Sequence, residues 1–208
     1  MRVVILAAGQ GTRMSPLTDH IPKCLLPFGD SNILIRLIGQ ILSRFSGEVC
    51  VVVGHEKEKV SEAIRGIYGN RIRIVENENY KDDVNILSLS LATYDEQESF
   101  IVFESDCLLD NKAMDKVFSS CLKDFSYWYT IGPFSPGQVG GILLSDLNGD
   151  VIDIDIVPKF ELKFKEYDKL LGILKVGPKD IIRFRNYISG EIKKSTKQYY
   201  LTPWINNL

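Results

Sequence analysis

The chain has 208 residues, 45% hydrophobic and 25% charged, and its 25 basic and 27 acidic residues leave a net charge of −2. This length suits one domain with its own core and is short for two. The balanced charge argues against nucleic acid or a membrane surface as the main partner, and the apolar runs are too short to span a bilayer. Four scattered cysteines without a C-x-x-C pair, and no recognisable signal peptide, predict free thiols in the cytoplasm.

Apolar segments of strand length alternate with amphipathic segments along residues 1–131. Strands are predicted at Arg2–Ala7, Glu48–Val53, Arg71–Glu76, Phe100–Glu104 and Ser126–Ile131. Helices are predicted at Asn32–Phe45, Glu56–Tyr68, Ile86–Tyr94 and Asn111–Leu122. The first strand is almost continuously apolar, as a parallel strand buried on both faces requires. The order predicts a single-domain α/β fold, a doubly wound Rossmann-like sheet with right-handed crossovers.

The pattern changes after about residue 132. "GGILLSDLNGDVIDIDIV", residues 140–157, is typical of two strands joined at an Asn-Gly turn. A further strand is predicted at Leu170–Val176, and a helix with proline at its start at Pro178–Tyr187. We therefore expect a mixed sheet with a small antiparallel insertion.

A glycine-rich loop, "AAGQGTR", ends the first strand. Ligands of open α/β sheets bind at the carboxyl ends of the strands, where such a loop lies. The bare backbone around Gly9 and Gly11 lets N–H groups approach an anion closely. Arg13 adds a planar fork of donors and Lys23 a compact charge. The loop therefore suits several neighbouring negative charges, such as a triphosphate.

Two other glycine-loop motifs do not fit these residues. A dinucleotide fingerprint needs a third glycine where this chain has Met14. A Walker A loop needs a Gly-Lys pair, and the sequence contains none.

The stretch "LAAGQGTRMSPLTDHIPKCLLPF" resembles the signature of the nucleotidyltransferases that include sugar-1-phosphate nucleotidylyltransferases. The resemblance implies the nucleotide-diphospho-sugar transferase fold, with residues 1–131 binding the nucleotide and 132–208 the acceptor. It further implies that the nucleoside triphosphate is wrapped by Leu6, Ala7, Ala8, Gly9, Gly11 and Thr12. Arg13 and Lys23 would be the catalytic residues, Arg13 on the phosphates and Lys23 bridging them.

A strand-end aspartate in "FIVFESDCLL", Asp106, matches the position at which this family binds magnesium. Mg²⁺ prefers one or two carboxylates together with phosphate oxygens and water, so a single aspartate suits it. The alternative is an aspartate that caps the next turn. Glu104, two residues earlier on the same face, is a weaker candidate.

The segment "NENYKDDVNILSLSLA" resembles the N-x-x-S-L segment of cytidylyltransferases that act on phosphocholine and related phosphates. Asn85 and Ser88 would then face the nucleobase, and CTP would be the nucleotide. The alternative is an ordinary helix start, because Asn and Ser both cap helices.

The acceptor side of the site is less marked. By resemblance, Lys169 in "YDKLLGILKV" is a candidate for the acceptor's phosphate, with Lys159 second, although both could be solvated surface lysines. An aromatic ring in "SYWYTIGPF" could face a cationic head group, with core packing as the alternative. The rings are Tyr127, Trp128 and Tyr129. Asp153 and Asp155 could add negative charge or simply face water.

Nucleotidyl transfer explains why no Ser-His-Asp or Cys-His set is found. The attacking group is already a phosphate anion, so no general base is needed, and His20 and His55 are expected in loops. The family usually carries a second metal-binding aspartate further on, for which no counterpart follows Trp204. The chain is therefore either a fragment or takes that ligand from elsewhere, and a homo-oligomer or a fusion to a further domain remains open.

Three functions stay open at this point. The first is a CTP-dependent cytidylyltransferase that makes a surface-polysaccharide precursor from a small phosphorylated acceptor. The second is a sugar-1-phosphate nucleotidyltransferase that uses UTP, dTTP or GTP. The third is a nucleotide-binding domain with little turnover.

Overall fold

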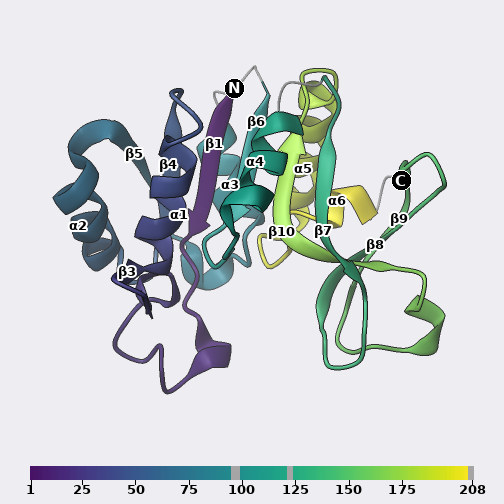
Figure 1. The fold of residues 1–208 in the computed structure, drawn as a ribbon, viewed down its shortest axis with the longest axis horizontal. Helices are drawn as coiled ribbons and strands as arrows, with labels where there is room; N and C mark the ends of the chain where they lie inside the picture. The colour runs from purple at the N-terminus through teal and green to yellow at the C-terminus, as the bar shows by residue number, and fades with distance from the viewer. Residues whose placement is uncertain (95–98, 121–123, 206–208) are drawn as a thin grey trace.

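A mixed eight-stranded sheet runs through the molecule in the computed structural model, which describes residues 1–94, 99–120 and 124–205 (Figure 1). The strands are β1 (Arg2–Ala7), β4 (Val49–Val53), β5 (Ile72–Glu76), β6 (Phe100–Glu104), β7 (Tyr127–Pro133), β8 (Gly140–Ser145), β9 (Val151–Val157) and β10 (Asp168–Val176). A separate hairpin pairs β2 (Pro27–Phe28) with β3 (Ser31–Asn32). The helices are α1 (Ile33–Leu42), α2 (Lys57–Tyr68), α3 (Ile86–Thr93), α4 (Asn111–Ser120), α5 (Ile181–Lys194) and α6 (Thr202–Ile205). No helix in the described ranges is long and apolar enough to cross a membrane.

The strand order is β5-β4-β1-β6-β10-β8-β9, with β7 also paired to β10. β1 pairs in parallel with β4 and β6, and β4 with β5. β10 runs antiparallel to both β6 and β7, so it separates two strands that run the same way. The predicted Rossmann-like mixed α/β sheet is confirmed, and its antiparallel part continues the main sheet rather than standing apart from it.

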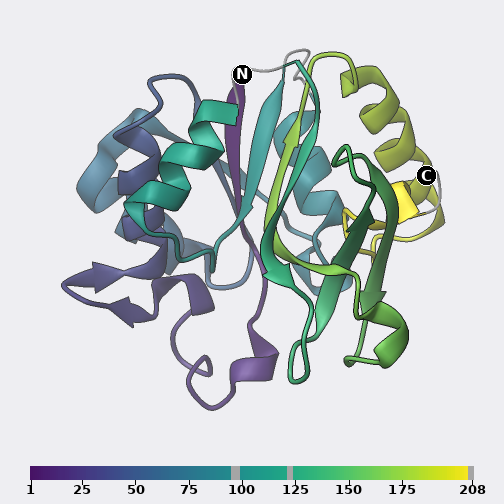
Figure 2. The same ribbon diagram turned by 45° about the vertical axis from the view of Figure 1, so that its right-hand side comes forward.

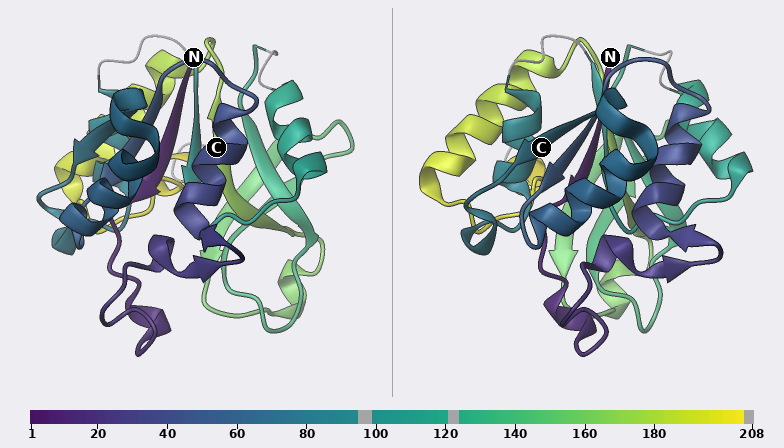
Figure 3. Two further views of the ribbon diagram at one scale, coloured as in Figure 1. Left: turned by 60° about the vertical axis from the view of Figure 1, so that its left-hand side comes forward. Right: turned by 90° about the vertical axis from the view of Figure 1, so that its left-hand side faces the viewer.

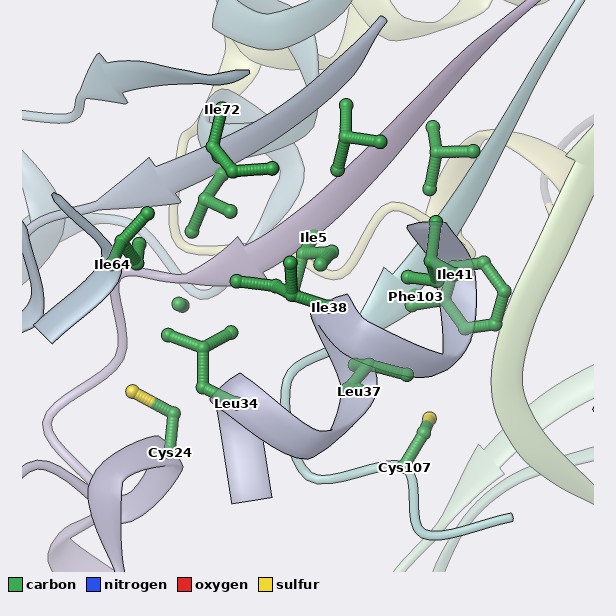
Figure 4. Packing of buried hydrophobic residues seen from close by; sticks show 14 of the residues in the cluster. Ile5, Cys24, Leu34, Leu37, Ile38, Ile41, Ile64, Ile72, Phe103 and Cys107 are labelled. Atoms are coloured by element: carbon green, nitrogen blue, oxygen red, sulfur yellow. The ribbon is translucent and has the colours of Figure 1, made fainter. Parts of the chain in front are cut away.

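Alternate residues of the buried strands face opposite layers of helices. Val3 and Ile5 of β1 belong to a core covered by α1, α2 and α4, whereas Val4 and Leu6 face α3, α5 and α6. Figure 3 shows the two helical layers on either side of the sheet. In Figure 4, the apolar face of α1 packs beneath Ile5 and beside Phe103. Two-sided burial explains why these strands are continuously apolar in sequence.

The predicted helices at 32–45 and 178–187 differ most from the structure at their ends. Asn32 accepts a hydrogen bond from the Ile35 N–H (2.9 Å), so it caps α1 instead of starting it, and the helix ends at Leu42, not Phe45. The prediction that Pro178 starts a helix is wrong, because a turn over residues 177–180 precedes α5. That helix also runs on to Lys194. The predicted end of the helix at 111–122 lies partly outside the described residues.

The hairpin of β8 and β9 forms as predicted, and β9 lies at the end of the strand order. The side chains of Asp153 and Asp155 accept hydrogen bonds from the N–H groups of the residues that follow them, at 2.9 and 2.7 Å. The Tyr167 hydroxyl also donates to Asp153. These carboxylates therefore cover backbone donors of a terminal strand, which hinders pairing with another chain.

Candidate active site

The loop after β1 folds back on itself at the carboxyl ends of the parallel strands, where Figure 2 shows it extending below the sheet. Gly11 has a φ of +67°, and a Cβ there would lie 3.1 Å from the Lys23 Cβ. The Thr18 hydroxyl donates to the Gly11 carbonyl (2.9 Å) and fastens the fold-back. Glycine at this position thus brings the two ends of the motif together.

A cavity of about 200 Å³ lies against this loop. We call it the nucleotide chamber. Of the site residues that the sequence predicts, the ones that line this cavity are Leu6, Ala7, Ala8, Gly9, Gly11, Arg13, Lys23, Asn85, Ser88 and Asp106. Thr12 is exposed at the start of a short 3₁₀ turn and does not line the chamber. The structure therefore gathers residues from four separate parts of the sequence at one place.

Lys23 and Asp106 form an ion pair in this chamber. Their side chains keep 31% and 37% of their surface exposed. Asp106 follows β6, which lies directly beside β1. A cation for phosphate oxygens and a carboxylate suited to a hard metal ion thus stand side by side. Within the described ranges, no three His, Cys, Asp or Glu side chains gather into a metal cluster.

Glu104 lies behind this pair, at the end of β6. Burial, and then the neighbouring Asp106 charge, raise the pKa of the Glu104 carboxyl. The Tyr200 hydroxyl donates to it at 3.3 Å. Gly172 passes so close that a Cβ there would lie 3.1 Å from the carboxyl carbon. Glu104 is therefore enclosed by protein and forms part of the floor of the site.

A second cavity, of about 710 Å³, adjoins the first. We call it the acceptor chamber. The two chambers share the residues Arg13, Met14, Lys23, Glu104, Asp106 and Tyr199. The rest of the acceptor chamber is mainly apolar or glycine: Cys107, Leu108, Trp128, Ile131, Val139, Gly140, Gly141, Ile156, Leu170, Leu171, Gly172, Tyr200 and Leu201, with Lys169. The charged side chains thus concentrate at the boundary between the chambers.

The two candidate acceptor lysines differ in position. The Lys169 ammonium donates to the carbonyls of Gly141 and Leu170, both at 3.1 Å, inside the acceptor chamber. Burial lowers the pKa of this amine, and the Glu104 charge opposes the effect. Lys159 is exposed after β9 and does not line the chamber. Only Lys169 is placed to meet a ligand there.

The three aromatic residues of β7 also have different surroundings. Trp128 lines the acceptor chamber. Tyr129 packs against the first core, with its hydroxyl on the Val117 carbonyl (3.3 Å), and the Lys175 ammonium lies over the Tyr127 ring. Neither Asp153 nor Asp155 lines either chamber. One ring of the three is therefore available to a ligand.

The segment around α3 begins with a closed polar network. The Asp83 carboxylate accepts from the N–H groups of Leu87 and Ser88 and from the Ser88 hydroxyl, at 3.0, 2.9 and 2.7 Å. The Asn77 amide donates to both Asp83 and Ser88, each at 2.9 Å. Asp83 rather than Asn85 thus holds the start of α3, and the Ser88 hydroxyl proton is already engaged.

Neither histidine lies in a chamber. His20 is exposed, and His55 follows β4, where its ring lies 5.9 Å from that of Tyr80.

A buried thiol also lies at the site. Cys24 lines the nucleotide chamber, and burial raises the pKa of its thiol to about 12.

Comparison with known proteins identifies the family. The model of the family described as nucleotidyl transferase matches residues 2–133. The chain belongs to this family. The chain is 30% identical over 111 residues to the choline-phosphate cytidylyltransferase of Streptococcus pneumoniae, across 53% of this chain and 47% of that protein. It is 27% identical over 159 residues to the bifunctional protein GlmU of Methanococcus aeolicus, across 76% of this chain and 36% of the other. The matches span less than half the length of these relatives.

Solved structures share the fold of this chain over 99% of its length. CTP:phosphocholine cytidylyltransferase from Streptococcus pneumoniae has a TM-score of 0.78 at 20% identity, with 84% of that chain covered. A UDP-glucose pyrophosphorylase complexed with UDP-glucose has a TM-score of 0.74 at 16% identity, with 85% of that chain covered.

Several residues that line the chambers are not predicted from the sequence. Met14 stands inside the recognised motif, but Tyr199 and Tyr200 lie far along the chain and carry no local signal. Contacts across the folded chain, such as that of the Tyr200 hydroxyl with Glu104, bring them to the site.

Proposed function

We propose that this chain is a cytidylyltransferase that transfers CMP from CTP to a small phosphorylated acceptor and releases pyrophosphate. The observation that carries the proposal is that two adjoining chambers share one charged boundary. A nucleotide in one and a phosphate in the other would meet at Arg13 and Lys23. Holding two repelling anions in line is the main task of phosphoryl-group transfer.

In the proposed reaction, an oxygen of the acceptor phosphate attacks the α-phosphorus of CTP. A new P–O–P bond forms while the bond from that phosphorus to the leaving pyrophosphate breaks, and no proton has to move. Arg13 and Lys23 stabilise the charge that develops on the phosphates. Lys169 holds the acceptor phosphate from the far side.

Magnesium fits the residues at the boundary. Asp106 supplies one accessible carboxylate, and one carboxylate suffices for Mg²⁺ when phosphates and water complete its shell. When bound, the ion supplies positive charge for the triphosphate. Lys23, paired with Asp106, would turn toward the phosphates in that state.

The lining of the acceptor chamber favours a particular class of acceptor. Beyond the charged boundary, most of its lining residues are apolar or glycine, and the Trp128 ring and the Lys169 ammonium are among them. A methylated or alkyl ammonium suits an aromatic wall of this kind. The cytidylyltransferase relatives support CTP and an acceptor of the phosphocholine kind.

Pyrophosphate release across CTP, UTP, dTTP, GTP and ATP, each with phosphocholine and with glucose 1-phosphate, tests the proposal. We expect turnover with Mg·CTP and phosphocholine to exceed every other pair. The sugar-nucleotide alternative, to which the GlmU relative points, predicts turnover with UTP or dTTP and the sugar phosphate. Tight nucleotide binding without turnover in any pair would favour a binding domain.

A further inference from the structure

The segment from Thr196 to Leu201 lies along the loop that precedes α3. We call it the C-terminal strap. The N–H groups of Val84 and Ile86 donate to strap carbonyls at 3.3 Å, and the Thr196 hydroxyl donates to the Asp82 carbonyl at 2.6 Å. Tyr199 of the strap lines both chambers, and Tyr200 lines the acceptor chamber. The strap is therefore a wall that the two chambers have in common.

One side chain, Asn85, fastens this wall from the nucleotide side. Its carbonyl oxygen accepts a hydrogen bond from the Tyr200 N–H at 2.8 Å. Asn85 makes no side-chain cap to α3, since Asp83 performs that function. Asn85 is also one of the residues that line the nucleotide chamber.

Tyr200 in turn organises the acceptor chamber. It is fully buried, and its ring stacks on that of Trp128 with the centroids 6.1 Å apart and the planes at 7°. Its hydroxyl donates to Glu104 at the boundary of the chambers. A shift of Tyr200 would therefore move both the aromatic wall and the floor of the acceptor chamber.

We propose that Asn85 is a positioning residue for the acceptor chamber. Its carbonyl holds Tyr200 and, through Tyr200, sets the positions of Trp128 and Glu104. Its NH₂ group remains for the nucleotide, and this second half rests on the proposed function. One amide thus serves both chambers, and acceptor affinity depends on a residue of the nucleotide chamber.

A matched pair of Asn85 variants distinguishes the role of its carbonyl oxygen from the role of its NH₂ group. Asn85→Asp retains an acceptor oxygen for the Tyr200 N–H and loses the NH₂ group, whereas Asn85→Ala loses both. Hydrogen exchange at the Tyr200 amide reports the anchor directly. Near-UV circular dichroism reports the packing of Trp128 and Trp204, whose rings contact each other beside the strap. Phosphocholine with Mg·CTP serves as the kinetic probe.

We expect Asn85→Ala to speed exchange at the Tyr200 amide and to raise the KM for phosphocholine, each about two- to tenfold, as the loss of one hydrogen bond predicts. Asn85→Asp should preserve both values while raising the KM for CTP. Wild-type exchange and acceptor KM in Asn85→Ala would overturn the proposal, as would equal damage in both variants. If wild-type protein shows no turnover with CTP, the cytidylyltransferase assignment fails, and the exchange comparison still decides the role of Asn85.

Discussion

The nucleotide chamber and the acceptor chamber are built in different ways. Most of the first comes from the end of β1, the loop that follows it, and Lys23 and Cys24, which Gly11 allows to fold back on that loop. The second takes residues from β7, β8, β9, β10 and the C-terminal strap. The proposed phosphate site is thus encoded locally, whereas the proposed acceptor site depends on the whole fold. The boundary that both chambers share is where substitutions should have the largest effect.

Replacing the boundary lysine should have the greatest effect on activity. Lys23→Ala should lower turnover about 10²- to 10³-fold, because one preorganised charge that faces both substrates is lost. The melting temperature should hardly change, since the side chain is partly exposed. Lys159→Ala, outside both chambers, is the matched control and should keep full activity. Equal turnover in the two variants would contradict a shared charged boundary.

Asp106→Asn should be nearly as damaging. The substitution preserves shape but removes the charge that a magnesium ion needs, so we expect about a 10²-fold loss of turnover. A magnesium titration checks the reason: the concentration that gives half-maximal activity should rise. An unchanged magnesium dependence, or full activity of wild-type protein in EDTA, would exclude the assigned role.

The packing of Gly54 against the nucleotide loop can be tested by a substitution outside the glycine-rich motif. Gly54 follows β4, and a Cβ there would lie 2.6 Å from the Tyr80 Cβ and 2.9 Å from the Ala8 carbonyl oxygen. Gly54→Ala should lower the free energy of unfolding by about 1–3 kcal/mol and weaken nucleotide binding. Gly66→Ala in α2, where the Cβ meets nothing within 4 Å, should instead stabilise by about 0.4–1 kcal/mol. Denaturant unfolding distinguishes them, and equal stability would contradict this contact.

The smallest expected effect concerns the two cysteine thiols at the site, which should resist alkylation. Burial raises the pKa of the Cys24 thiol to about 12, and also raises that of Cys107. A raised pKa keeps a thiol protonated as the pH increases, so neither should be alkylated by iodoacetamide between pH 8 and 9. Both should react once the protein is denatured. Peptide mass spectrometry gives the extent at each residue, and rapid labelling of Cys24 in folded protein would show that the chamber is more open than described.

The sequence predicts the nucleotide half better than the acceptor half, for physical reasons. Two-sided burial makes β1, β4 and β6 almost continuously apolar, with Arg2 and Glu104 only at the strand ends, so their positions could be predicted directly from the sequence. The ends of helices are harder to predict. Asn32 caps α1 and a turn precedes α5, and both depend on local backbone geometry that the periodicity of apolar residues does not show.

The same contrast holds within the site. Gly11, Arg13 and Lys23 stand in one recognisable stretch. The Tyr200 hydroxyl donates to Glu104, 96 positions away in the sequence, and no local sequence pattern predicts that hydrogen bond. The sequence predicts that Asn85 faces a base or caps a helix, and it cannot predict the bond to the Tyr200 N–H, which exists only in the folded chain.

The central claim is that a nucleotide and a phosphorylated acceptor react across the shared boundary. Phosphorus NMR of the chain with Mg·CTP and phosphocholine tests it most directly, because product and leaving group are resolved in one spectrum. We expect a coupled pair of diphosphate resonances from the new P–O–P bond, growing in equal amount with pyrophosphate. Consumption of CTP without that pair, or a diphosphate product only from UTP or dTTP with glucose 1-phosphate, would contradict it.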